Sequence, residues 1–172
     1  PRTMHLPWSK NLQNNDRCIK NLDAFIGQQV VVTEKRDGEN TTLYDDYLHA
    51  RSVDSKDHPS RAVIRQLHAA FKYEIPANWR ICGENLYAKH SIAYPHLKSF
   101  FEVFAIFDET NTRLSWDQMI EWCQLIGVGV GPGFENGLPM VPVLYRGIWD
   151  EAAIRKLDAR LNNYAVEGYV VT

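Results

Sequence analysis

One lysine in this sequence is placed where it could act as a nucleophile. Residues 30–33 form an apolar, β-branched run, Lys35 follows this run, and Asp37-Gly38 gives a turn signal directly after it. A lysine is ordinarily an ammonium ion and cannot attack an electrophile in that state. Desolvation at the strand end and a nearby positive charge, from Arg36 or a bound metal, would favour the reactive amine. The alternative is a surface hairpin with solvated charges, because turns select Asp-Gly for its backbone conformation.

Four later segments also contain side chains that could take part in chemistry. They are His49–Ser52, Gly83–Ile92, Phe100–Asp108 and Val166–Val171. Taken singly, each side chain has an ordinary explanation. Phe104 would belong to a core and Arg51 to a surface ion pair, while Glu84 and Glu167 would be solvated charges at strand edges. Only their joint order along the chain favours a functional explanation.

With Lys35-Arg-Asp-Gly38, these segments resemble motifs I, Ia, III, IIIa and IV of the covalent nucleotidyltransferase superfamily, which contains polynucleotide ligases and mRNA capping enzymes. The motifs follow one another in the superfamily's order between residues 35 and 168. DNA ligases and capping enzymes carry an arginine two residues after the motif I glycine, where this sequence has Asn40. Asparagine there, with the stretch Glu84–Ile92, resembles the bacterial and phage RNA ligases related to the second phage RNA ligase.

This resemblance implies an ATP-dependent RNA ligase with a nucleotidyltransferase fold. Lys35 would attack the α-phosphorus of ATP, release pyrophosphate and form a lysyl-AMP phosphoramide. The AMP would then pass to an RNA 5′-phosphate, and a 3′-hydroxyl would displace it. The implied cofactors are ATP and Mg²⁺, and the implied partners are RNA ends or a nicked duplex. Oligomeric state does not follow from the sequence.

The resemblance also assigns residues to the base and the sugar of ATP. Glu34 would contact the adenine edge through its side chain or its backbone, and Phe104 would stack on the adenine ring. Glu84 would accept a hydrogen bond from a ribose hydroxyl, because an ionised carboxylate is only an acceptor.

A second group of residues would lie near the phosphates. Asp37 and Asn40, with Gly38 between them, would lie beside Lys35 and the phosphates. Arg51 would bind a phosphate or the RNA end, for which a forked guanidinium is suited. Glu167 would help to hold Mg²⁺ over the α-phosphate.

One motif of the family is missing. Motif V is a strand with lysines that contact the ATP phosphates, and the sequence ends at Thr172, five residues after Glu167. We therefore expect residues 1–172 to be an adenylation domain without its motif V segment and without the C-terminal RNA-binding domain of related ligases. Pro1 in place of an initiator Met also indicates a trimmed N-terminus.

Two alternatives stay open at this point. A GTP-using cap guanylyltransferase would share the chemistry, but Asn40 and the lack of room for an OB-fold domain count against it. A non-catalytic nucleotide-binding module would explain the missing motif V, but the retained Lys35 counts against that alternative.

The elements that must position these residues are a mixture of strands and helices. Strands are expected at residues 28–33, 41–44, 49–53, 79–86, 100–107, 141–145 and 166–172, the first two as a hairpin around Lys35. Helices are expected at residues 16–26, from 60 to about 72, from a capping box at Ser115 and Gln118, and from about 150. Because strands and helices do not alternate as in a βαβ fold, the sequence predicts an α+β fold with mainly antiparallel sheets flanked by helices. The glycine-rich segment 127–133 follows a helix and contains Pro132, so we interpret it as a loop without a phosphate-binding role.

The amino-acid composition is typical of a folded globular protein. The 172 residues are 45% hydrophobic and include five Trp, eight Tyr and seven Phe, enough for one domain with or without a small appendage. No apolar run approaches the ~20 residues of a membrane span. Three widely spaced cysteines argue against a disulfide framework and favour a reducing, cytoplasmic location. The net charge of −2 means that RNA would have to bind a local cluster. His90 and His96 show no ligand spacing and are expected either at the surface or as supporting groups behind a site.

Overall fold

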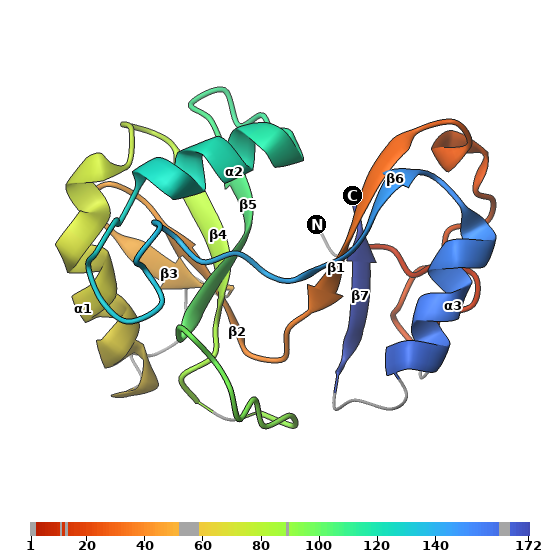
Figure 1. Ribbon diagram of the computed structural model, residues 1–172, viewed down its shortest axis with the longest axis horizontal. Helices are drawn as coiled ribbons and strands as arrows, with labels where there is room; N and C mark the ends of the chain where they lie inside the picture. The colour runs from red at the N-terminus through yellow and green to blue at the C-terminus, as the bar shows by residue number, and fades with distance from the viewer. Residues whose placement is uncertain (1–2, 11, 13, 52–58, 89, 162–165) are drawn as a thin grey trace.

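Two antiparallel sheets, each covered by helices, lie side by side in this protein (Figure 1). The computed structural model describes residues 3–10, 12, 14–51, 59–88, 90–161 and 166–172. All pairs of neighbouring strands in both sheets are antiparallel. The expected α+β fold with antiparallel sheets is therefore confirmed.

The first sheet has three strands and one helix. Its spatial order is β6 (Val143–Ile148), β1 (Gln29–Lys35) and β7 (Gly168–Val171). The helix α3 (Glu151–Leu161) packs on it, and Val30 and Val32 of β1 form a core with Ile154 and Leu157 of α3. Strand alternation turns Lys35 to the face opposite that core.

The second sheet has four strands and contains the larger core. Its spatial order is β3 (Leu48–Ala50), β2 (Glu39–Leu43), β4 (Arg80–Asn85) and β5 (Phe101–Phe107). The helices α1 (Ala62–Phe71) and α2 (Trp116–Leu125) pack on one face of it. Leu43, Ile81 and Val103 of the sheet meet Ile64 of α1 and Met119 of α2 in this core. The opposite face carries the polar residues described below.

Several local signals in the sequence are confirmed. Ser115 and Gln118 form the capping box of α2: the Ser115 hydroxyl accepts from the Gln118 N–H, and the Gln118 side chain accepts from the Ser115 N–H. Gly127 ends this helix with φ of +70°, a conformation that glycine adopts without steric cost. Residues 127–133 form a loop, and His90 and His96 are exposed, as expected.

The helix expected at residues 16–26 is wrong. His5 donates its backbone N–H to Arg17 and accepts from the N–H of Ile19, so this part of the chain runs beside the N-terminal segment. A 3₁₀ turn at Asp23–Phe25 is the helical structure found there, and Ile26 is 66% exposed. Over a window this short, the spacing of apolar residues in an extended segment can match that of a helix, so the pattern alone was misleading.

The hairpin expected around Lys35 is also wrong. Both strands exist, but β1 pairs with β6 and β7, whereas β2 pairs with β3 and β4. Residues 36–38 therefore carry the chain from one sheet to the other (Figure 1). This crossing places Lys35 at the junction of the two sheets.

The remaining boundaries differ by a few residues from those expected. The third strand ends at Ala50, and residues 52 and 53 of the expected strand lie outside the described residues. In the part of the chain that the structure describes, no helix combines the length and the apolar character needed to cross a membrane.

Candidate active site

Lys35 is the last residue of β1, as the sequence predicts. It lies opposite Gly168, the first residue of β7. Its side chain is 49% exposed and forms an ion pair with Glu167, which precedes β7. The fold thus brings the candidate nucleophile and the candidate metal ligand together from opposite ends of the chain.

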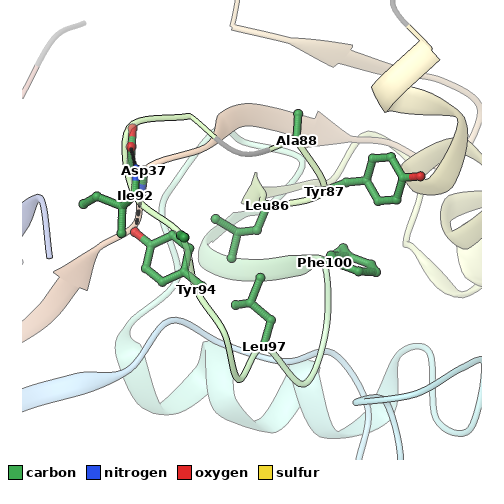
Figure 2. Close-up of a pocket in the computed structure, with 9 residues that line it drawn as sticks. Asp37, Leu86, Tyr87, Ala88, Ile92, Tyr94, Leu97 and Phe100 are labelled. Atoms are coloured by element: carbon green, nitrogen blue, oxygen red, sulfur yellow. Dashed lines mark hydrogen bonds between the residues drawn. The ribbon is translucent and has the colours of Figure 1, made fainter. Parts of the chain in front are cut away.

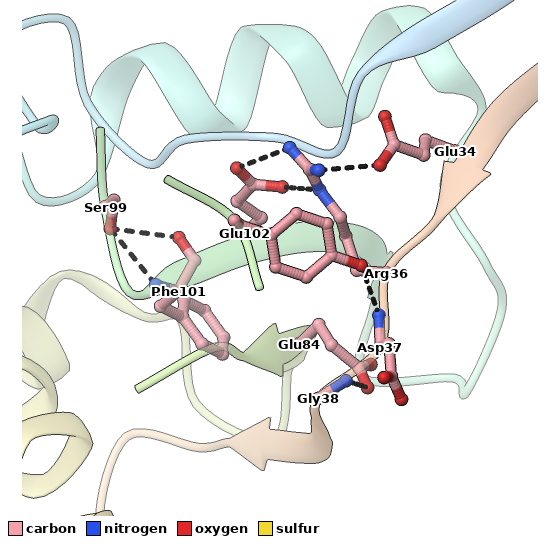
Figure 3. A network of polar contacts seen from close by, with 9 residues as sticks. Glu34, Arg36, Asp37, Gly38, Glu84, Ser99, Phe101 and Glu102 are labelled. Carbon is pink, nitrogen blue, oxygen red and sulfur yellow. Dashed lines mark hydrogen bonds and ion pairs between the residues drawn. The ribbon is translucent and has the colours of Figure 1, made fainter. Parts of the chain in front are cut away.

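Arg36 does not direct its charge at Lys35, which corrects one sequence-based hypothesis. Its guanidinium donates to Glu34 at 2.6 Å and to both carboxylate oxygens of Glu102 at 2.7 and 3.2 Å (Figure 3). Although burial opposes it, hydrogen bonding and charge from Glu102 and Glu34 raise the pKa of Arg36. The guanidinium also lies 4.7 Å from the centre of the Tyr94 ring. Arg36 therefore ties β1 of the first sheet to β5 of the second.

Asp37 is held by the segment between β4 and β5. Its carboxylate accepts from the N–H groups of Ser91 and Ile92 at 2.7 and 2.9 Å, and its own N–H donates to the Tyr94 hydroxyl at 2.8 Å. A hollow of about 220 Å³ lies beside these contacts, and Leu86, Leu97 and Phe100 also line it (Figure 2). Asp37 lies near Lys35 as expected, but its carboxylate binds the backbone of this segment.

Gly38 fits because the chain passes very close to β4 at this residue. A Cβ atom on Gly38 would lie 2.4 Å from the backbone oxygen of Asn85 and 3.0 Å from the side chain of Glu84. The N–H of Gly38 donates to the Glu84 carboxylate at 3.1 Å. Glycine is therefore required at this position, because a larger residue would not fit against the backbone of β4.

Glu84 has an unusual ionisation. Burial raises its pKa to about 7, and the negative charges of Glu167 and Asp37 act in the same direction. The N–H of Gly38 and the charge of Lys35 oppose this rise. A strongly shifted carboxyl beside a candidate nucleophile is a feature of functional sites.

The polar face of the second sheet collects further candidates. Asn40 and Glu102 both lie opposite Glu84 in the strand register, so the three side chains share one face. Arg51 is exposed, and its backbone N–H donates to the Asn40 carbonyl at 2.8 Å. A β-bulge in β5, where Cys82 pairs with Ala105 but Gly83 pairs with Val103, leaves Phe104 as the unpaired residue.

Phe104 is half-buried and is not one of the buried core residues. Bulges occur next to active sites, where they redirect a side chain. The functional explanation of Phe104 thus gains support over a core role.

The donor set fits a magnesium ion only in company with phosphates. Among the described residues, no group of three or more His, Cys, Asp and Glu side chains could hold a metal by itself. Mg²⁺ in nucleotide sites typically takes one or two carboxylates, with substrate phosphates and water completing its shell. Glu167, whose side chain is 39% exposed, is a donor of this kind.

Sequence reasoning missed the roles of Arg36, Glu102 and Tyr94. Glu102 carried a usable signal, because a carboxylate inside the apolar run 100–107 must find a partner when the strand is buried. Tyr94 carried no such signal, since its contacts with Arg36 and Asp37 arise only in the folded chain.

Comparisons with known proteins identify a family by its model and a shared fold among solved structures. A family model for RNA ligase matches residues 28–172. Among solved structures, an archaeal ATP-dependent RNA ligase has a TM-score of 0.64 and 19% identity, over 87% of this chain and 40% of its own. An RNA ligase of Naegleria gruberi with pyrophosphate has a TM-score of 0.63 and 21% identity, over 87% and 48%.

A mutant of the Naegleria gruberi ligase with ATP and Mn has a TM-score of 0.60 and 20% identity, with the same coverage of 87% and 48%. At such identities the likeness shows the shared fold. The chain spans less than half the length of these structures. A search of curated proteins found no match.

Replacing Gly38 with alanine is expected to destabilise the fold by about 1–3 kcal/mol, because the new methyl group would collide with the Asn85 backbone. Urea unfolding gives the free energy. The matched control is Gly131→Ala, where a Cβ meets nothing within 4 Å. Equal stabilities of the two variants would contradict the close approach at Gly38.

Glu84 is expected to make stability depend on pH. Its folded pKa of about 7 lies above the ordinary 4.5, so the folded protein keeps a proton that the unfolded chain releases. This contribution is complete below about pH 4.5 and is lost as pH rises through about 7. Urea unfolding from about pH 4 to pH 8 should show stability falling with pH relative to Glu84→Gln. Parallel pH profiles of the two proteins would contradict the shifted pKa.

Proposed function

The chain belongs to the RNA ligase family, and we propose that it performs the adenylation step of an ATP-dependent RNA ligase. The observation that supports this most directly is the meeting of Lys35, Glu84 and Glu167 at the junction of the two sheets. These residues come from three distant segments of the chain, and the fold brings them to one junction.

Lys35 would attack the α-phosphorus of ATP in line. A phosphorus–nitrogen bond forms, the bond to the pyrophosphate oxygen breaks, and the nitrogen gives up a proton. In the unreacted protein Lys35 is paired with Glu167, so the lysine must lose this partner and its proton before it can attack.

Glu84, Phe104 and Asn40 would surround the nucleoside and its phosphate. The carboxyl of Glu84, with a pKa of about 7, can hydrogen-bond a ribose hydroxyl in either protonation state. The carboxylate of Glu34 is bound to Arg36 and its N–H to the Pro142 carbonyl. We therefore propose that Glu34 would contact the adenine edge through its backbone carbonyl, while its side chain holds Arg36.

Arg51 and Asp37 would have different roles in the proposed site. Arg51 is exposed beside Asn40 and would bind a phosphate or the RNA end. Asp37 and Gly38 would act by holding the Lys35 turn against Glu84 and the segment after β4.

ATP and a divalent metal find support in a relative, because a Naegleria gruberi ligase structure contains ATP and Mn. For this chain we propose Mg²⁺, with Glu167 as one protein ligand. When bound, Mg²⁺ would supply positive charge that offsets the charge on the departing pyrophosphate.

The later steps would transfer AMP to an RNA 5′-phosphate and let a 3′-hydroxyl displace it. The products would be joined RNA ends or a sealed nick, which is the chemistry of RNA repair. A cytoplasmic site of action is part of this proposal and agrees with the unpaired cysteines Cys18, Cys82 and Cys123.

Intact-protein mass spectrometry after incubation with ATP and Mg²⁺ tests the proposal. We expect the mass to rise by one AMP, with no adduct from GTP and none in Lys35→Ala. The control is Lys20→Ala, which removes an exposed lysine elsewhere and should keep the adduct. An adduct from GTP would favour a cap guanylyltransferase, and an adduct that survives in Lys35→Ala would refute the assignment of the nucleophile.

A further inference from the structure

A row of aromatic and basic side chains crosses the second sheet on the polar face. We call it the arginine row: Arg80, Phe107 and Arg113. Arg80 of β4 lies opposite Phe107 of β5, and Phe107 in turn bridges to Arg113. The Arg80 guanidinium lies 4.0 Å from the centre of the Phe107 ring. The row shares a face with Glu84, four residues along β4 and about 13 Å away.

Within the described residues, neither Arg80 nor Arg113 forms an ion pair with a carboxylate. Arg113 donates to the carbonyl of Phe104 at 3.1 Å. Burial lowers the pKa of Arg113, with only the Cys82 thiol acting against this effect. Arg80 is half-buried and Arg113 is exposed, so an anion from solution can reach both guanidinium groups.

Aromatic rings continue this surface at the turn between β2 and β3. Tyr44 and Tyr47 stack with ring centres 4.3 Å apart and planes 7° from parallel, and Tyr47 is 51% exposed. His49 lies next in line, 6.1 Å from the Tyr47 ring. Arg51 follows His49 by two residues, so it lies on the same face and beside Asn40. A path of rings and cations therefore leads from the arginine row to the candidate active site.

We propose that this face binds the RNA strand, with Arg80 and Arg113 on backbone phosphates and Tyr47 stacking on a base. Interleaved cations and exposed rings are the features with which proteins hold single-stranded nucleic acids. The net charge of −2 provides no overall positive charge for RNA, so RNA binding would depend on a local cluster of cations. The proposal rests on the proposed function, because it identifies the strand that Lys35 would serve.

The test compares RNA binding by three double variants of the chain. Arg80→Gln with Arg113→Gln removes the two charges, and Arg80→Lys with Arg113→Lys keeps them. The matched control is Lys20→Gln with Lys72→Gln, because Lys20 lies in the N-terminal segment and Lys72 directly follows α1, which packs on the other face. Fluorescence anisotropy with a 5′-phosphorylated single-stranded RNA, at several salt concentrations, gives the dissociation constant.

We expect the glutamine variant to bind RNA about 10-fold more weakly at about 0.15 M salt, with a salt slope reduced by about 1.4, as for two lost phosphate contacts. The lysine variant should recover most of the affinity, and the control should match the unmodified chain. Lysyl-AMP formation and the KM for ATP should stay unchanged in all of them.

Equal RNA affinity of the glutamine variant and the control would overturn the proposal, as would a rise in the KM for ATP without a change in RNA binding. Circular dichroism checks that each variant is folded. If the glutamine variant unfolds, the salt slope of the unmodified chain decides, since a slope shallower than about −1.4 leaves no room for two contacts. Failure of the proposed function has a different signature: arginine-dependent RNA binding by a chain that forms no lysyl-AMP.

Discussion

The guanidinium of Arg36, held between Glu34 and Glu102, connects the two sheets at the point where the candidate nucleophile lies. All three side chains are nearly buried, with 10–13% of their surface exposed. A charge in such surroundings is stable only with its partners, and removal of one partner costs about 3–5 kcal/mol in comparable cases. Because Arg36 directly follows Lys35, this contact fixes where β1 ends. It leaves Lys35 free to face Glu167 across the first residue of β7.

The acidic residues near Lys35 differ in their surroundings. Some are held in hydrogen bonds that support the fold, and others are available for chemistry. Asp37 and Glu102 are occupied by hydrogen bonds from backbone N–H groups and from Arg36. Glu167 is exposed and can exchange its partner, while half-buried Glu84 has a pKa of about 7. The same sheet face then extends from Glu84 to the arginine row. One face would thus serve the nucleotide at one end and the RNA strand at the other.

Local signals predicted most elements correctly, and they failed where distant contacts decide. The capping box at Ser115 and the strand before the Asp37-Gly38 turn depend on neighbouring residues, and both exist, although the strand continues to Lys35 instead of ending at residue 33. The turn signal at Asp37 was interpreted as a hairpin, but its carboxylate binds the N–H groups of residues 91 and 92. That segment lies more than 50 residues from Asp37 in the sequence, so the residues around Asp37 could not reveal this contact. The order of the motifs along the chain was enough to select Lys35, Glu84 and Glu167. The role of Arg36 could not be predicted in this way, because it depends on Glu102, 66 residues away.

In the proposed reaction, Lys35 carries AMP at the junction of the two sheets. A crystal structure of the chain after reaction with ATP and Mg²⁺ would show whether it does. We expect continuous density from the Lys35 Nζ to phosphorus, with the ribose at Glu84 and the adenine against Phe104. Density for AMP on another residue, or a nucleotide bound away from this junction, would contradict it.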